Sequence, residues 1–247
     1  MKIAVVSDIH GNLRALEAVI ADMQRTGVDR VINLGDLLSG PLEPAETADL
    51  LMALHWPTLC GNHERQLLAC AQGGGGHSDR FAFKHTTAAH RDWLAALPAT
   101  LTFAEEGVYA CHGAPGDDLR YFLEHVGAQG VELAAEQQIA AAAHGISASL
   151  LLCGHSHLPR VVALPDGRLI VNPGSVGLPA YDDDYPYYHR VENGSPHARY
   201  AVCERADGGW HIDLRAVPYD FQAAARVAEA HGAPAWARWL SSGRAAQ

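Results

Sequence analysis

The stretch KIAVVSDIHG at residues 2–11 decides the fold of this chain. Residues 2–7 are apolar on both alternating faces, which is typical of a buried strand in an α/β sheet. Asp8 and His10 follow directly, and side chains two apart in extended backbone project to the same side. The stretch therefore predicts a central strand that presents two potential metal ligands at its carboxyl end.

The same arrangement recurs in the first third of the chain. A second strand is predicted at residues 29–34 and ends at Asp36, and a shorter apolar run at residues 56–60 delivers Asn62 and His63. Helical patterns follow the two strands, at residues 13–20 and 44–54. Because ligands of open α/β sheets collect outside the carboxyl ends of the strands, we expect these loop residues to be neighbours in space.

Beyond residue 100 the pattern indicates mainly strands. They are predicted at residues 100–104, 107–111, 148–153, 160–164, 168–171, 199–204 and 210–216. Three more potential ligands lie at or just beyond the ends of two of these strands: His112, His155 and His157. Residues 119–144, which are rich in alanine, are expected to be largely helical.

One domain over residues 1–247 is the most economical organisation, because the chain has no internal repeat and no low-complexity linker. Two segments interrupt the rhythm of strands, at about residues 65–99 and 115–145. The first is predicted to contain a helix at about 84–97. Each segment is either a cap over a site or a peripheral excursion. A C-terminal helix is expected at about residues 220–240, amphipathic over 220–231.

Composition excludes several classes of protein. A net charge of −10 argues against a broad nucleic-acid surface, since neutralising phosphates needs clustered lysine and arginine. The longest apolar runs are too short for a membrane helix, and the N-terminus turns polar too early for a secretory signal, so a cytoplasmic location is expected. The five cysteines form no CxxC pair and are expected to be buried packing residues.

The potential ligands form a chemically distinctive set. They are three carboxylate or amide oxygens and four imidazoles: Asp8, His10, Asp36, Asn62, His112, His155 and His157. Seven such ligands are too many for one tetrahedral zinc and suit two octahedral ions that share a ligand. A carboxylate can bridge two cations, and Asp36, which stands alone in its segment, is the natural bridge.

Five motifs resemble those of the calcineurin-like metallophosphoesterase superfamily: SDIHG at 7–11, GDLLSGP at 35–41, GNHE at 61–64, CHG at 111–113 and GHSH at 154–157. NPGSVG at 172–177 is similar to the small bacterial and archaeal phosphodiesterase-like branch. The resemblance implies a four-layer α/β/β/α sandwich of two mixed sheets flanked by helices. It implies Asp8, His10 and His157 on one metal, Asn62, His112 and His155 on the other, and Asp36 on both.

The same resemblance gives His63 the role of binding the scissile phosphate or protonating the leaving oxygen, and it implies manganese, iron, zinc, nickel or magnesium. Two cations lower the pKa of a water that bridges them, so that hydroxide exists near neutral pH, and they hold the phosphate for attack. Asn12 and Glu64 either orient ligands or cap loops. The NPGSVG loop is expected to support the site from outside.

The second motif narrows the substrate. Protein phosphatases and bacterial symmetrical dinucleoside-tetraphosphate hydrolases read GDxVDRG there, whereas this chain lacks the arginine. The leading hypothesis is a phosphodiesterase acting on a small nucleotide or similar diester. A phosphomonoesterase, a dinucleoside-polyphosphate hydrolase and a non-catalytic interaction scaffold remain as alternatives, and the presence of His63 favours catalysis. The expected partner is a small phosphate-ester substrate, and the oligomeric state stays open.

Overall fold

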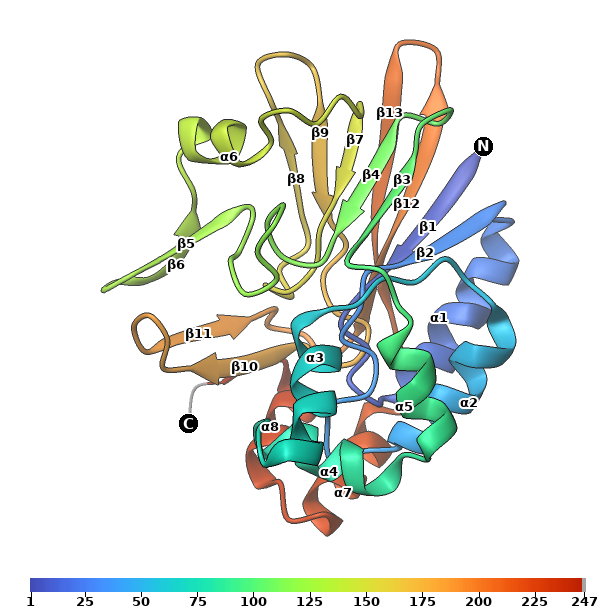
Figure 1. The fold of residues 1–247 in the computed structure, drawn as a ribbon, viewed down its shortest axis with the longest axis vertical. Helices are drawn as coiled ribbons and strands as arrows, with labels where there is room; N and C mark the ends of the chain where they lie inside the picture. The colour runs from blue at the N-terminus through green and yellow to red at the C-terminus, as the bar shows by residue number, and fades with distance from the viewer. Residues whose placement is uncertain (246–247) are drawn as a thin grey trace.

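Two mixed β-sheets form the centre of the computed structural model, which describes residues 1–245 (Figure 1). The first sheet has the order β13 (Gly209–Val217), β12 (Ala198–Ala206), β1 (Lys2–Val6) and β2 (Arg30–Asn33). The second has the order β3 (Thr100–Phe103), β4 (Val108–Cys111), β7 (Leu150–Leu152), β9 (Leu169–Asn172) and β8 (Arg160–Ala163). In the first sheet β1 and β2 run parallel, and the β1–β12 and β12–β13 pairings are antiparallel. In the second sheet β4, β7 and β9 run parallel, and the outer strands β3 and β8 pair antiparallel.

Strand β1 shows why both faces of the first sheet are apolar. Ile3 and Val5 pack between the two sheets, against residues of β4, β7 and β9. Ala4 and Val6 face the other way and pack against helices α1 (Leu13–Thr26) and α2 (Pro44–Leu54). Alternation along the strand thus fills two separate cores, as the apolar run at residues 2–7 predicted.

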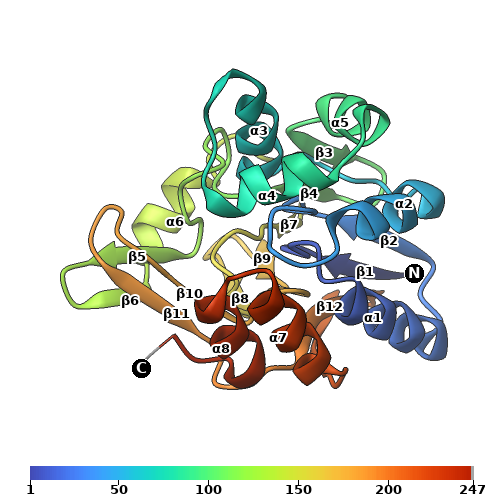
Figure 2. The same ribbon diagram turned by 90° about the horizontal axis from the view of Figure 1, so that it is seen from below.

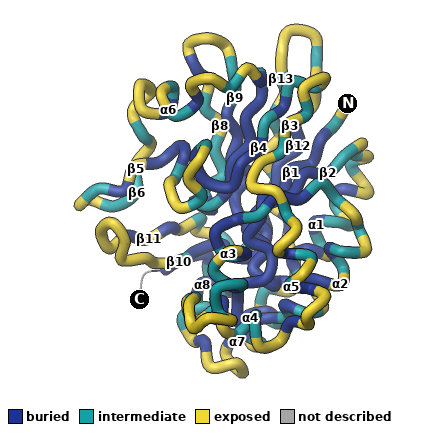
Figure 3. The backbone as a smooth tube through the Cα atoms, in the orientation of Figure 1, coloured by how far each residue is buried: buried dark blue, intermediate teal, exposed yellow. Residues whose placement is uncertain are grey.

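Helices cover the outer faces of both sheets (Figure 2). With α1 and α2, helices α3 (Asn62–Ala69), α4 (His77–His85) and α5 (Ala88–Ala95) contribute to the core outside the first sheet. Helix α6 (Glu136–Ala142), with Phe122 and Leu123, covers the second sheet. The predicted fold class, two mixed sheets flanked by helices, is therefore confirmed. Buried backbone is concentrated in these layers, whereas the hairpin tips are exposed (Figure 3).

The helical prediction for residues 119–144 is wrong for most of the segment. A hairpin of β5 (Glu124–Gly127) and β6 (Gly130–Leu133) occupies its middle, and only α6 is helical. Gly130 has φ of +111°, which suits the hairpin turn. Glu124 and Val126 are buried while His125 is exposed, a strand alternation that the surrounding alanines concealed.

Two other helices are divided where one was predicted. Residues 84–97 span the end of α4 and all of α5, because the Thr87 side chain caps α5 by accepting a hydrogen bond from the His90 amide. The C-terminal segment forms α7 (Phe221–Ala230) and α8 (Pro234–Ser242). Gly232 has φ of +75° and Pro234 opens α8, so the chain cannot continue as one helix.

Near the C-terminal helices, a second hairpin of β10 (Ala180–Asp183) and β11 (His189–Glu192) stands beside α8. Asp182 and Asp183, two members of the acidic run at residues 182–184, belong to β10. Within residues 1–245, no helix has both the length and the apolar character needed to span a membrane.

Candidate metal centre

The predicted ligand loops meet where β1, β2, β4 and β7 end. Backbone hydrogen bonds join them directly: the Asp8 amide donates to the Gly35 carbonyl at 3.0 Å, and the His10 amide donates to the Asp36 carbonyl at 3.0 Å. The Gly154 amide donates to the His112 carbonyl at 2.7 Å and so connects the two strand ends of the second sheet. The sheet topology thus gathers all the segments that the sequence singled out.

The backbone of this cluster is strained. Among the described residues, six non-glycine residues have a left-handed φ, and five of the six are predicted ligands: Asp8, His10, Asp36, His155 and His157. Their φ values lie between 53° and 66°. Each such residue costs about 1 kcal/mol, and strain of this kind persists where the surroundings over-determine it. Its concentration here marks a functional site.

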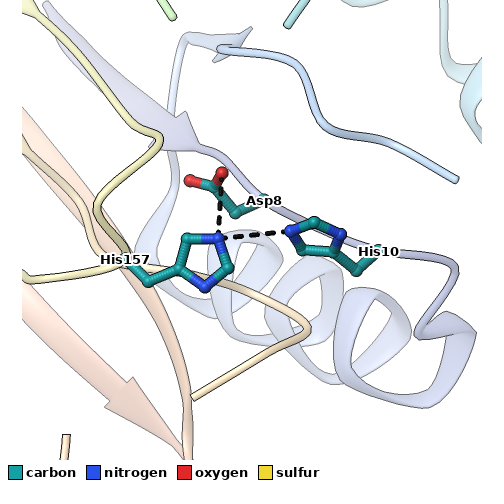
Figure 4. A group of neighbouring side chains, drawn as sticks. All are labelled: Asp8, His10 and His157. Atoms are coloured by element: carbon teal, nitrogen blue, oxygen red, sulfur yellow. Dashed lines mark hydrogen bonds and ion pairs between the residues drawn. The ribbon is translucent and has the colours of Figure 1, made fainter. Parts of the chain in front are cut away.

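Asp8, His10 and His157 form the first group of donors, and their ligand atoms lie within 4.8 Å of one another (Figure 4). The Nε2 atoms of His10 and His157 are 3.2 Å apart. Oδ1 of Asp8 lies 3.3 Å from Nε2 of His157. All three side chains are buried.

The hydrogen bonds of the His10 and His157 rings to backbone use Nδ1 and leave both Nε2 atoms available. Nδ1 of His10 donates to the Ser39 carbonyl at 2.7 Å, and Nδ1 of His157 donates to the Leu178 carbonyl at 2.8 Å. Both rings therefore turn Nε2 toward the other ring. Oδ1 of Asp8 is also buried without a hydrogen-bond partner. Three electron-pair donors that face one point fit a cation.

Asp36, His112 and His155 form the second group. His112 donates through Nδ1 to the Leu34 carbonyl at 2.7 Å, and its Nε2 lies 3.1 Å from Oδ2 of Asp36. Asn62 joins this group, with its Oδ1 3.0 Å from the same Nε2. His155 is reversed: its Nε2 donates to a backbone carbonyl, which leaves Nδ1 as the ligand atom. Mixed imidazole and oxygen donors suit manganese, iron, nickel or zinc.

The pKa values of the side chains in the two groups also favour a cation site. Burial would raise the pKa of Asp36, but the neighbouring His112 and His63 rings lower that pKa well below its usual value. Burial would lower the pKa of His112, but the Asp36 carboxylate raises it to about 10. Burial and the nearby His157 ring lower the pKa of His10 to about 3. The cluster thus holds ionised carboxylates and attracts positive charge.

His63 lies beside the second group and is oriented by a residue that the sequence did not reveal. Its Nδ1 is 2.7 Å from Oδ1 of Asp79, whose other oxygen accepts from the Gly76 amide at 2.7 Å and so caps α4. Its amide donates to Oδ1 of Asp36 at 2.9 Å. Burial lowers the pKa of His63, but the Asp36 and Asp79 carboxylates raise it to about 9. The only local signal for Asp79 was its place in the first turn of a helix.

Glu64 and Asn12, the two candidate supporting residues, have different roles. Glu64 is fully buried and accepts hydrogen bonds from the Asp36, Leu37 and Gly61 amides, each at 2.8 Å. It therefore fixes the loop that carries Asp36. Asn12 caps α1 through its side-chain oxygen and donates to the Gly177 carbonyl, so it shapes a loop rather than touching a ligand side chain.

The NPGSVG loop supports the site from behind. The Ser175 hydroxyl donates to the Asp8 carbonyl at 2.7 Å, and the Asn172 amide donates to the Gly154 carbonyl at 2.8 Å and to the Ser156 hydroxyl at 3.0 Å. Both residues are buried. They hold the backbone of two ligand loops in place.

A cavity of about 1150 Å³ opens over both groups and His63. The segment at residues 65–99 contributes Gln66 and Ser78 to its wall, and the segment at 115–145 contributes a longer stretch that includes Arg120. Arg65 and Asp118 join the two segments by an ion pair of 2.6 Å. Both insertions therefore border the site.

The chain is similar to known proteins both in sequence and in structure. Residues 1–193 match the family model described as the calcineurin-like phosphoesterase superfamily domain. An uncharacterised protein of Methanocaldococcus jannaschii is 24% identical over 95% of this chain and 94% of its own length. The crystal structure of a metallophosphoesterase from Sphaerobacter thermophilus superposes with a TM-score of 0.76 at 24% identity, covering 99% of this chain and 100% of that one. A hypothetical protein from Pyrococcus horikoshii gives 0.72 at 18% identity, covering 99% of each chain.

Proposed function

Because the chain belongs to the calcineurin-like phosphoesterase superfamily, we propose that it is a dimetal phosphodiesterase acting on a small nucleotide or similar diester. The observation that carries the proposal is the pair of donor groups, each with three ligand atoms within 4.8 Å of one another, that combine a buried carboxylate with two imidazoles. Oxygen-rich paired sites of this kind keep positions open for chemistry, whereas structural sites close their shell.

We assign the ligands as follows. Asp8, His10 and His157 would hold one ion, Asn62, His112 and His155 the other, and Asp36 both. The family uses two metal ions, which when bound supply Lewis acidity toward the phosphate and activate water near neutral pH. The carbonyls that accept from the histidine rings fix each ring in the tautomer that binds metal.

His63 would act on the leaving oxygen. Its Nδ1–H donates to Asp79, so its Nε2 is the atom left to face the substrate and give up a proton. His63 lines the cavity together with the ligands His10 and Asp36. Since its pKa is raised to about 9 by the two carboxylates, it holds this proton at neutral pH.

A diester is favoured over a monoester by the size of the cavity. Its volume of about 1150 Å³ is above the roughly 300 to 1000 Å³ of typical pockets for drug-sized ligands, and it exceeds the need of a phosphate with one small group. Two organic groups can therefore extend from the phosphate. The protein-phosphatase arginine is absent from the second motif, which also disfavours the monoesterase and dinucleoside-polyphosphate alternatives.

A substrate panel tests the proposal. We expect bis-p-nitrophenyl phosphate to be hydrolysed faster than p-nitrophenyl phosphate when manganese is added. We expect His63→Ala to lower turnover by about 10²- to 10⁴-fold while metal content stays unchanged. A preference for the monoester would overturn the diester assignment. No turnover of any phosphoester with any divalent ion would instead favour a non-catalytic scaffold. Metal analysis of protein purified without added metal would identify the native ions.

A further inference from the structure

The wall of the cavity is aromatic next to the metal-facing histidines. Ring centroids are 4.7 Å apart for Tyr181 and His157, and 5.9 Å apart for Trp236 and His10. Both pairs are close to edge-on, with interplanar angles of 66° and 75°. Tyr181 lies on β10 and Trp236 on α8, so two elements outside the family's five motifs bring aromatic rings to within one ring's distance of the first group of ligands.

These rings are held in place rather than free to turn. The hydroxyl of Tyr181 is hydrogen-bonded to that of Tyr121, which in turn lies 3.0 Å from Nε2 of the buried His189. Trp236 packs so closely against Gly40 that a Cβ there would lie 3.0 Å from the indole ring. Preorganised aromatic rings in a cavity favour a flat ligand, because little side-chain entropy remains to be lost.

The charge of the cavity limits which phosphate compounds it can take. Beyond the ligand cluster, its lining includes the carboxylates of Asp117, Asp182 and Asp183 but a single arginine, Arg120, and within the described part of the chain no lysine lines it. Glu124 also lines it but is paired with Arg160 at 2.9 Å. Two metal ions can neutralise one phosphate, whereas further phosphates would lie against these carboxylates.

From these two features we infer that the substrate carries a single phosphate and a planar aromatic group, of the kind that a nucleobase provides, which stacks on Trp236 and Tyr181. This inference rests on the proposed function and narrows it: a nucleoside monophosphate diester fits the cavity and a dinucleoside polyphosphate does not. Stacking of one base on an aromatic side chain contributes about tenfold or more to binding.

Binding and turnover test the aromatic subsite separately. We expect thymidine 5′-monophosphate to bind at least tenfold more tightly than methyl phosphate by isothermal titration calorimetry. Trp236→Leu should remove most of that difference while methyl phosphate changes less than threefold. Trp236→Phe keeps a ring and should keep the preference, and Trp210→Leu, a tryptophan on β13 outside the cavity, should leave it unchanged. Equal binding of the two ligands, or an unaltered preference in Trp236→Leu, would overturn the subsite.

Turnover decides the number of phosphates. Thymidine 5′-p-nitrophenyl phosphate should exceed diadenosine tetraphosphate in kcat/KM by at least a hundredfold, and Asp182→Asn with Asp183→Asn should narrow that gap. A higher kcat/KM for the tetraphosphate would refute the inference while leaving phosphoester hydrolysis intact. If no phosphoester is hydrolysed but the nucleotide still binds selectively, the proposed function fails and the aromatic subsite stands.

Discussion

Replacing Asp79 by Asn tests whether the contact between Asp79 and His63 assists the reaction. Asp79 is 1% exposed and bonded through both oxygens, to Nδ1 of His63 and to the Gly76 amide. Asparagine has one oxygen, so it can accept one of the two hydrogen bonds and presents N–H groups to the other donor. The variant keeps the shape of the side chain and removes its charge.

The size of the effect follows from that exchange. A hydrogen bond to a charged group contributes about 1.5 to 3 kcal/mol and a neutral one about 0.5 to 1.5 kcal/mol. The difference, roughly 1 to 2 kcal/mol, corresponds to a five- to thirtyfold fall in kcat. His63→Ala, which removes the proposed proton donor itself, should lower kcat by about 10²- to 10⁴-fold.

The assay is steady-state hydrolysis of a diester with a poor alkoxide leaving group, compared with a p-nitrophenyl diester. The fall in kcat caused by Asp79→Asn should be larger with the alkoxide diester, because a poor leaving group depends more on protonation. The alkaline fall of kcat should also begin at lower pH, because His63 loses a carboxylate that raises its pKa. In Asp79→Asn combined with His63→Ala, kcat should be no lower than in His63→Ala alone. Additive losses in the double variant would refute the coupling.

Three further perturbations address the rest of the molecule. Removing metal with a chelator should lower the melting temperature, and returning manganese should restore it. If free metal had been a hundredfold above its Kd, the loss of stability is about 2.7 kcal/mol. An unchanged melting curve would contradict a fold that metal binding stabilises. Glu64→Ala leaves three buried amides unpaired and should cost at least about 3 kcal/mol in urea unfolding, with Glu64→Gln less damaging. Burial alone would raise the pKa of Asp22, but hydrogen bonds from the Tyr200 hydroxyl and Arg215 outweigh burial, and the pKa is lowered. The Asp22 carboxylate therefore stabilises the folded protein fully above pH 3.8, and this stabilisation is lost as the pH falls through the lowered pKa. Asp22→Asn should flatten this acid limb, whereas Asp213→Asn, at the exposed partner of the same Arg215, should retain it.

The sequence was most informative where a strand ends in a ligand. Apolar residues dominate the middle of β1 and β2 because both strands are buried on both faces, and the chain leaves the sheet at the same edge after each strand. Parallel neighbours must end together, so Asp8 and Asp36 were predictable neighbours. His155 and His157 likewise follow β7 of the second sheet, but left-handed backbone at both residues replaces the extended backbone that was expected, and the two rings join different donor groups.

Prediction failed where contacts between distant segments outweigh local preference. Residues 119–144 read as helical because of their alanines, yet Glu124 turns inward to Arg160, 36 residues away, and the segment becomes a hairpin. Asp79 carries no pattern that associates it with His63, because the pairing depends on how α4 packs beside α3. Tyr181 and Trp236 reach the cavity only through the placement of β10 and α8. Such residues are defined by tertiary structure alone.

The strained ligand loops explain why the metal centre and the proton donor should act as one unit. Five left-handed residues cost about 5 kcal/mol together, and buried carboxylates and facing imidazole lone pairs add to that cost. Cations at the two groups would offset the cost of the buried carboxylates and the cost of the facing imidazoles together. Metal binding would therefore be coupled to the stability of these loops. The His63 amide donates to Oδ1 of Asp36, and Glu64 holds the Asp36 amide. An ion that fixes Asp36 therefore also fixes the backbone from which His63 acts.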